Sequence, residues 1–249
     1  MTSTSGITSP TPASVLTSAY VDRAVGQLRP DYRALLIVVS GVRGGPSDEA
    51  SDAALSQAEA SVRTRLGGSP PETLPQIAVW REAFLGFGVK PRQARSSVEA
   101  LLRRVDAGLP RIDRLTDLYN AVSVEHLIPI GGEDLGRYAG PPRLVRAAGD
   151  EPFDTIADGR PTTVTADPGE VVWRDDLGVT CRRWNWRQCV RTRLGETTSD
   201  ILFILDGLEP VGPAELEAAG AALVEALTLD APPASATSRL LSAPDGRLP

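Results

Sequence analysis

The stretch DRLTDLYNAVSVEHLIPIGGEDLGRYAG (residues 113–140) marks the point where the chain changes its character. Residues 113–127 carry apolar side chains at helical spacing, which predicts a helix. After Pro129, glycine, proline and aspartate become frequent, and the apolar runs that follow are short and β-like. Helices before this boundary and strands after it indicate an α+β fold.

The N-terminal side contains one predicted strand and several predicted helices. The run ALLIVVSG (34–41) is a short apolar segment closed by glycine, which is typical of a buried strand. Helices are expected over 47–66, with Ser47 as N-cap, over 74–87, and over 96–108. In the last of these, Ser96 and Glu99 match the capping-box pattern.

The C-terminal side contains short strands and one long helix. Strands are expected near residues 144–147, 170–173, 179–186 and 201–205, and an amphipathic helix over 213–229. We therefore expect N-terminal helices packed with a mixed or antiparallel β-sheet region and a C-terminal helix. The Ser/Thr/Pro-rich ends, 1–13 and 230–249, are expected to be disordered tails around one domain, 14–229.

Composition limits the function classes. The chain has 249 residues, a net charge of −6 and a pI near 5.0, which excludes a general basic coat for nucleic acid but not a local basic patch. No apolar run approaches the ~18–20 residues of a membrane-spanning helix. The first residues lack a basic start followed by an apolar core, so we expect no secretory signal, no membrane contact and a cytoplasmic location.

The few residues suited to metal or nucleophilic chemistry limit the possible mechanisms. His126 is the single histidine, so any histidine-dependent nucleophilic mechanism would run through it, and a two-histidine metal site is impossible. Cys181 and Cys189 have no zinc-like spacing and are expected to be reduced thiols. Phosphate-cradling glycine motifs are absent. We therefore expect no metal and no cofactor.

Arginines and tryptophans gather in residues 159–200. Trp173, Trp184 and Trp186 are three of the chain's four tryptophans, and residues 174–193 carry six arginines against two aspartates. As one strand, residues 181–188 would place Cys, Arg, Asn and Arg on one face and Arg, Trp, Trp and Gln on the other. Such a cluster suits phosphate contact and base stacking. A solvated hairpin with inward-packed tryptophans is the other interpretation, and residue types alone favour it.

Two further segments offer polar groups. Residues 81–117 carry eight basic and five acidic side chains, which suits either phosphate contacts or a charged solvent face. In residues 117–140, Asn120 and Ser123 share one helical face, which suggests a pocket wall or an outer face. Residues 131–134 (Gly-Gly-Glu-Asp) are expected to form a turn that exposes backbone amides beside a carboxylate, or a purely structural turn.

Together these segments resemble a known family. Residues 91–153, then PGEVVWRDD (168–176), CRRWNWRQC (181–189) and ETTSD (196–200) are similar to the B3/B4 domain. This domain is the editing and tRNA-binding module of the bacterial-type phenylalanyl-tRNA synthetase beta subunit, and it also occurs as a freestanding protein. The resemblance extends over roughly residues 15–229. It implies a B3/B4 fold and hydrolysis of mischarged aminoacyl-tRNA in trans.

The resemblance also suggests how family positions map onto this chain. A family motif ending in Leu-His-Ala-Phe-Asp aligns with residues 130–134, so the aspartate is kept as Asp134 and Gly131 replaces the histidine. The family's glycine-rich loop aligns with residues 185–189. A family threonine is kept as Thr198, and the family glutamate that reads a tyrosine hydroxyl falls near Ile204. Because isoleucine cannot pair with a hydroxyl, tyrosine specificity does not carry over.

The expected activity is that of a trans-editing deacylase that binds tRNA. Ester hydrolysis needs a positioned water and a stabilised oxyanion more than a strong nucleophile. The candidate catalytic residues are Asp134, Glu170, Asn185 and Arg187, and of these Asp134 or Glu170 is expected to bind the substrate ammonium or to orient the water. The candidate substrate-binding residues are Asn120, Ser123, Gly131, Gln188, Thr198 and Ile204. The candidate RNA-binding residues are Arg92, Arg95, Arg103, Arg104 and Arg182.

Two other functions are compatible with the same residues. The chain could be a non-catalytic module that binds tRNA or an amino acid, which the loss of the family histidine and glutamate favours. It could instead be a small-molecule hydrolase that uses Cys181 or Cys189. No histidine adjoins either cysteine in the sequence, which weighs against this last interpretation.

Overall fold

The computed structural model describes residues 11–228 and 233–244. It is an α+β structure, as the sequence predicts. Three small elements begin it: α1 (Pro12–Ser18), β1 (Tyr20–Val21) and α2 (Arg23–Leu28). No helix in the described ranges is both long enough and apolar enough to cross a membrane.

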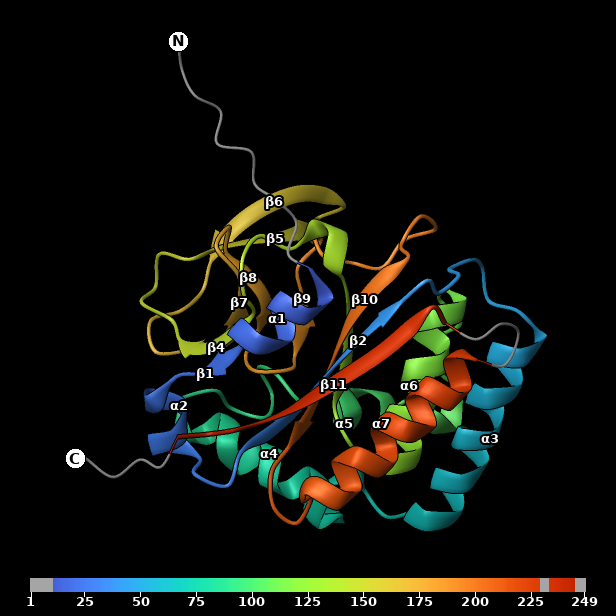
Figure 1. Ribbon diagram of the computed structural model, residues 1–249. Coiled ribbons are helices and arrows are strands. Elements are labelled where there is room, and N and C mark those ends of the chain that lie inside the picture. Colours follow the sequence, from blue (N-terminus) through green and yellow to red (C-terminus); the bar gives the residue numbers. More distant parts are fainter. Residues whose placement is uncertain (1–10, 229–232, 245–249) are drawn as a thin grey trace.

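The central sheet has four antiparallel strands in the order β11-β2-β10-β3 (Figure 1). Their bounds are β2 (Arg33–Ser40), β3 (Ile130–Asp134), β10 (Asp200–Gly207) and β11 (Ser235–Ser242). All six interior residues of β2 are buried. Leu35, Ile37 and Val39 face one core, and Ala34, Leu36 and Val38 face another. This double burial explains the continuous apolar run that predicts the strand.

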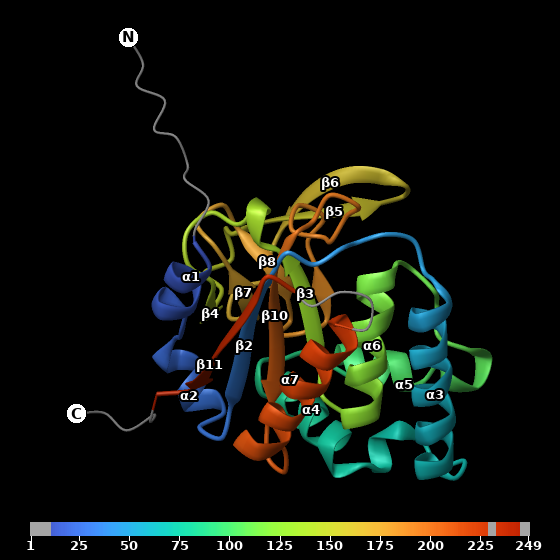
Figure 2. The same ribbon diagram turned by 45° about the vertical axis from the view of Figure 1, so that its right-hand side comes forward.

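A second sheet packs beside the first and has the order β1-β4-β7-β8-β9. Its main strands are β4 (Arg143–Arg146), β7 (Val171–Arg174), β8 (Val179–Arg182) and β9 (Arg187–Gln188). The hairpin of β5 (Pro152–Ala157) and β6 (Arg160–Thr165) forms a separate two-stranded sheet at one end of the molecule (Figures 1 and 2).

Helices cover the central sheet. Figure 2 shows α3, α6 and α7 together beside it. The helices are α3 (Glu49–Leu66), α4 (Pro75–Gly86), α5 (Ser97–Leu102), α6 (Arg114–His126) and α7 (Pro213–Leu227), with short 3₁₀ turns η1 (Pro71–Thr73), η2 (Val105–Ala107) and η3 (Leu135–Arg137). The predicted helices are confirmed, with two differences at their ends. Asp48 rather than Ser47 caps α3, and α5 ends at Leu102, where a 3₁₀ turn follows.

Two predictions about the polar segments are corrected by the structure. Residues 130–134 are strand β3 rather than a turn, because each of these residues pairs with one of residues 201–205 in β10. Gly132 lies opposite Phe203, and a Cβ there would come within 2.9 Å of the Phe203 ring. Residues 181–188 are not one strand, because Arg183 and Trp184 adopt left-handed backbone angles (φ 47° and 67°) and turn the chain back into β9.

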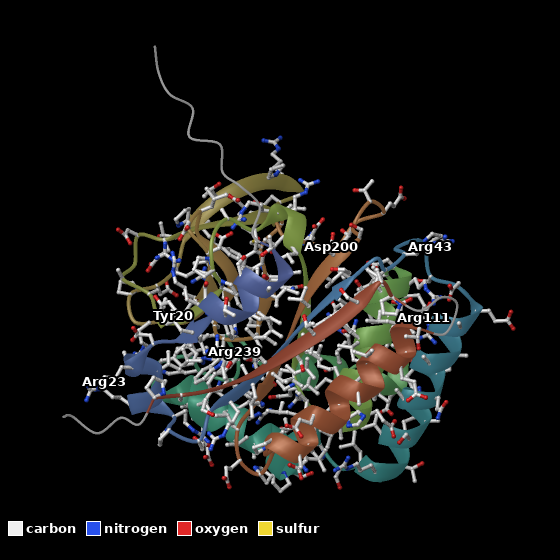
Figure 3. All side chains as sticks on the ribbon, in the orientation of Figure 1. Tyr20, Arg23, Arg43, Arg111, Asp200 and Arg239 are labelled. Atoms are coloured by element: carbon white, nitrogen blue, oxygen red, sulfur yellow. The ribbon has the colours of Figure 1, made fainter. Side chains whose placement is uncertain are left out.

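The expected tails are also corrected. The helix α1 already begins at Pro12, and residues 1–10 lie outside the described residues. Residues 235–242, expected in a disordered tail, form β11 and pair with β2 along eight residues. The Arg239 guanidinium donates to the carbonyl oxygens of Leu16, Thr17 and Ala19 at the end of α1, so β11 also holds the N-terminal helix (Figure 3).

We expect β11 to be part of the stable domain. A chain that ends at residue 228 should lose more than about 2 kcal/mol of unfolding free energy, because β2 loses its edge partner and the core loses the buried Leu241 side chain. Chemical denaturation of the shortened and full chains measures the difference. Equal midpoints would show that β11 contributes nothing to stability.

Candidate functional site

A cavity of about 210 Å³ lies between the two sheets and α5. Its walls come from α5, α6, β3, β10 and the turn that joins β8 to β9. Segments far apart in the sequence therefore meet around one space, as expected for a binding site.

The cavity brings together many of the predicted site residues. Seven of them line it: Asn120, Gly131, Asn185, Arg187, Gln188, Ile204 and Arg104. The Gln188 side-chain amide donates to the carbonyl oxygen of Gly132 at 2.8 Å, which ties β9 to β3 across the cavity.

Asp134, Thr198 and Ser123 are not among the residues that line this cavity. The Thr198 hydroxyl donates to Asp134 Oδ2 at 2.8 Å, and Asp134 Oδ1 accepts the Gly136 amide at the start of η3. The Ser123 hydroxyl donates to the carbonyl oxygen of Ile128 and completes the end of α6. These three side chains fix local backbone rather than face the cavity.

Glu170 and Arg182 form a buried ion pair away from the cavity wall. Arg182 Nε donates to Glu170 Oε1 at 2.9 Å, and the Arg183 amide donates to the same oxygen at 2.8 Å. Asp167 also pairs with Arg182 at 3.2 Å. Hydrogen bonds to this carboxylate hold the start of the β8–β9 turn, and neither Glu170 nor Arg182 lines the cavity.

The arginines of α5 and its neighbours differ in their availability. Arg81, Arg95 and Arg103 all pair with the fully buried Glu99, and Arg81 and Arg103 also pair with Glu72. Their charges are therefore largely balanced within the protein. Arg92 is exposed.

Arg104 and Arg187 carry the unbalanced positive charge at the cavity. Both are exposed, both line the cavity, and neither forms an ion pair with a described residue. The guanidinium carbons of Arg183 and Arg187 lie 4.4 and 4.5 Å from the Trp186 ring centre. This stack holds Arg187 against the wall, where it can meet an anion.

The turn at residues 183–186 places the remaining groups. Trp184 is fully buried and contacts Tyr32, Trp80 and Phe87 edge-on or tilted, with ring centres 5.0, 5.6 and 6.3 Å away. Burial of this side chain stabilises the left-handed backbone, which is uncommon for residues other than glycine. The turn then directs Asn185 and Arg187 to the cavity.

Two buried acids line the cavity and were missed by sequence reasoning. Glu133 and Asp206 are only 1% and 3% exposed. Burial raises the pKa of each carboxyl to about 7. The hydrogen bonds from Tyr138 to Glu133, and from Tyr32 and Asn185 to Asp206, lower these pKa values but do not outweigh burial. Asp206 and Ile204 lie on one face of β10, so strand alternation from Ile204 is the signal that could have identified Asp206.

Cysteine, histidine and metal chemistry gain no support from the geometry. Cys181 lines the cavity, but burial raises the pKa of its thiol well above the usual range, so the thiolate is disfavoured. Cys189 is a second free, buried thiol. His126 lies at the end of α6, outside the cavity wall. In the described parts of the chain, no three His, Cys, Asp or Glu side chains gather as metal ligands would.

We expect Glu170→Gln to lower stability by about 3–5 kcal/mol, because it leaves the buried Arg182 guanidinium without its main counter-charge. Chemical denaturation checks this. An unchanged denaturation midpoint would show that this ion pair contributes nothing to stability.

The two buried acids also predict a pH dependence of stability. Their pKa values are higher in the folded chain than in the unfolded chain, so the native state binds more protons between about pH 4 and pH 7. Stability from these groups is thus lost as pH rises through this range, by up to about 1.4 kcal/mol per pH unit for each group. Denaturation of the Glu133→Gln/Asp206→Asn double variant should show a flatter profile than the wild type. Parallel profiles would contradict the raised values.

The chain was compared with known proteins. The B3/4 domain family model matches residues 79–217, a range that includes the whole cavity wall. No curated protein matches the chain. An N-terminal fragment of the phenylalanyl-tRNA synthetase beta-subunit from Pyrococcus horikoshii is similar at 15% sequence identity with a TM-score of 0.44, and the match covers 90% of this chain and half of that fragment. Because the family model matches more than half of the 249 residues, the chain belongs to the B3/4 domain family.

Proposed function

We propose that the chain binds the aminoacyl end of tRNA and hydrolyses the ester of mischarged aminoacyl-tRNA. The observation that carries this proposal is the polarity of the cavity. Buried acceptors lie in its wall, and the unpaired arginines Arg104 and Arg187 lie at its exposed side. An aminoacyl ester on a nucleotide has the matching polarity, with an ammonium group at one end and phosphates at the other.

The wall contains groups suited to ester hydrolysis. Arg187 and the Gln188 amide can stabilise the negative charge that develops on the ester oxygen, and Asn120 can orient the acyl group. Glu133 is our candidate for the group that accepts the proton of the attacking water, because a pKa of about 7 suits a base that works near neutral pH. An activated ester requires no covalent intermediate with the protein.

Membership of the B3/4 domain family and the motif resemblance support an RNA-related substrate. The net charge of −6 limits the strength of that contact. We therefore expect weak, salt-sensitive binding led by the acceptor end, in which Arg104 and Arg187 make the phosphate contacts.

A binding module without turnover is the second candidate. Gly131 and Ile204 both line the cavity, at the positions where the resemblance places the family's histidine and glutamate. If those two side chains were essential for turnover, this chain would bind aminoacyl-tRNA and protect its ester instead of cleaving it.

A deacylation screen distinguishes the two candidates. Purified protein is mixed with a panel of cognate and mischarged aminoacyl-tRNAs, and ester half-lives are followed against buffer. We expect one class to be cleaved and Arg187→Ala to slow that cleavage about 100-fold or more, as for loss of a charge-stabilising donor. Arg160→Ala, which removes an exposed arginine from the β5–β6 hairpin, is the matched control and should retain full activity.

Other outcomes would redirect the assignment. Lengthened half-lives across the panel would establish the binding module. Turnover that survives Arg187→Ala but is lost in Asp134→Asn would move the active site to the Asp134–Thr198 pair.

The dependence of tRNA binding on salt concentration tests the two phosphate contacts. The Arg104→Ala/Arg187→Ala variant should lower the slope of log affinity against log salt concentration by about 0.7 for each arginine.

A further inference from the structure

Asp206 is a buried carboxyl without a cation. It lies near the end of β10 and lines the cavity. The Tyr32 hydroxyl donates to Asp206 Oδ1, and the Asn185 amide donates to Oδ2 at 3.3 Å. No ion pair within the described ranges involves this carboxyl. Two other buried acids described above, Glu99 and Glu170, face arginine instead.

Asn185 adds an unsatisfied acceptor beside Asp206. The side chain is 8% exposed, and its Nδ2 points to Asp206. Its Oδ1 has no hydrogen-bond donor among the described residues. A buried acceptor left without a donor is unfavourable, so this part of the cavity wall is complete only when something else supplies an N–H or O–H.

The surroundings favour a cation as the source of that donor. Trp173, Trp184 and Trp186 line the same cavity. Their rings lower the local dielectric, which strengthens an ion pair with Asp206. A primary ammonium has three N–H donors, so it can serve Asp206 and Asn185 Oδ1 at once.

Glu133, the other buried acid of the cavity, is less suited to this role. The Tyr138 hydroxyl donates to Glu133 Oε2 and lies 3.2 Å from the Thr180 hydroxyl, so one oxygen of this carboxyl already has a protein partner. The unsatisfied acceptor lies beside Asp206 instead.

We infer that Asp206 and Asn185 form a receptor for the free α-ammonium group of an aminoacyl ester. This inference rests on the proposed function for the identity of the ester, but the receptor itself requires neither tRNA nor turnover. It assigns the ammonium contact to Asp206, in place of Asp134 and Glu170, whose carboxylates are held by Thr198 and Arg182. A substrate whose amino group is acylated or missing would leave Asp206 and Asn185 Oδ1 unpaired.

Binding of small amides tests the receptor without tRNA. The probes are L-phenylalaninamide and L-alaninamide, each paired with the analogue that lacks only the amino group, 3-phenylpropanamide or propanamide. Affinity is measured by calorimetry and by the fluorescence of the wall tryptophans. We expect at least one amino amide to bind about tenfold or more tightly than its deamino analogue, the effect of a hydrogen-bonded charge.

Variants then assign the effect to Asp206. Asp206→Asn keeps the shape of the side chain and should remove the preference for the amino amide. The matched control is Asp200→Asn, the same change at the other end of β10, outside the cavity wall, and it should keep the preference (Figure 3). Circular dichroism confirms that each variant is folded. If Asp206→Asn does not fold, the pairs of amides still test the receptor on the wild-type chain.

The remaining outcomes separate the two proposals. Equal affinity for amino and deamino probes, or no binding of any probe at millimolar concentration, would overturn the receptor whatever the deacylation screen shows. Tighter binding of Nα-acetyl-lysinamide than of L-alaninamide would also overturn it, because a side-chain ammonium would then be the group read. Selective binding of amino amides with no ester cleavage would leave the receptor standing and refute the hydrolase.

Discussion

The insertion of Trp184 between Tyr32, which precedes β2, and Trp80 of α4 is the contact on which the site depends. Arg183 and Trp184 adopt left-handed backbone angles, which costs free energy for residues that carry a Cβ. The buried indole, packed on Tyr32 and Trp80, and the hydrogen bonds of Glu170 to this end of β8 offset that cost. Without this turn, the residues after it would continue along β8, and the cavity would lose one of its walls. Burial of the Trp184 side chain therefore positions the polar side chains of Asn185 and Arg187 at the cavity.

Ion pairs within the protein leave few arginines near the cavity available to bind a ligand. Within the described chain, the buried carboxylates of Glu99 and Glu170 each hold more than one guanidinium. These ion pairs fix α5 and the β8–β9 turn, which both contribute to the cavity wall and meet where the Ser97 amide donates to the carbonyl oxygen of Asn185. Arg104 and Arg187 are left to face solvent beside it. An acidic protein can thus present a small positive area at one place, which a count of arginines along the sequence does not reveal.

More of the fold than of the candidate site could be predicted from the sequence. The α+β class, the buried strand β2 and the main helices follow from apolar spacing and caps, because those signals are local. Strand β11 was not predicted, because six of its eight residues are exposed and its partner β2 lies about 200 residues away in the sequence. Asn185, Arg187 and Gln188 were identified by their residue types and by the resemblance. Asp206 was not, since its role depends on Tyr32 and Asn185, two residues that only the folded chain brings to it.

The relation between Ile204 and Asp206 shows how one strand can change the ligand chemistry of a cavity. Both side chains lie on the same face of β10, two residues apart, and both line the cavity. An apolar residue at 204 cannot pair with a substrate hydroxyl, whereas a carboxyl at 206 can pair with a cation. Because the two positions are separated by about 7 Å along a strand, the polar contact moves within the same wall instead of disappearing. Under the proposed ammonium receptor, the acid that the resemblance places at position 204 is replaced by an acid at position 206, so the cavity has altered recognition rather than none.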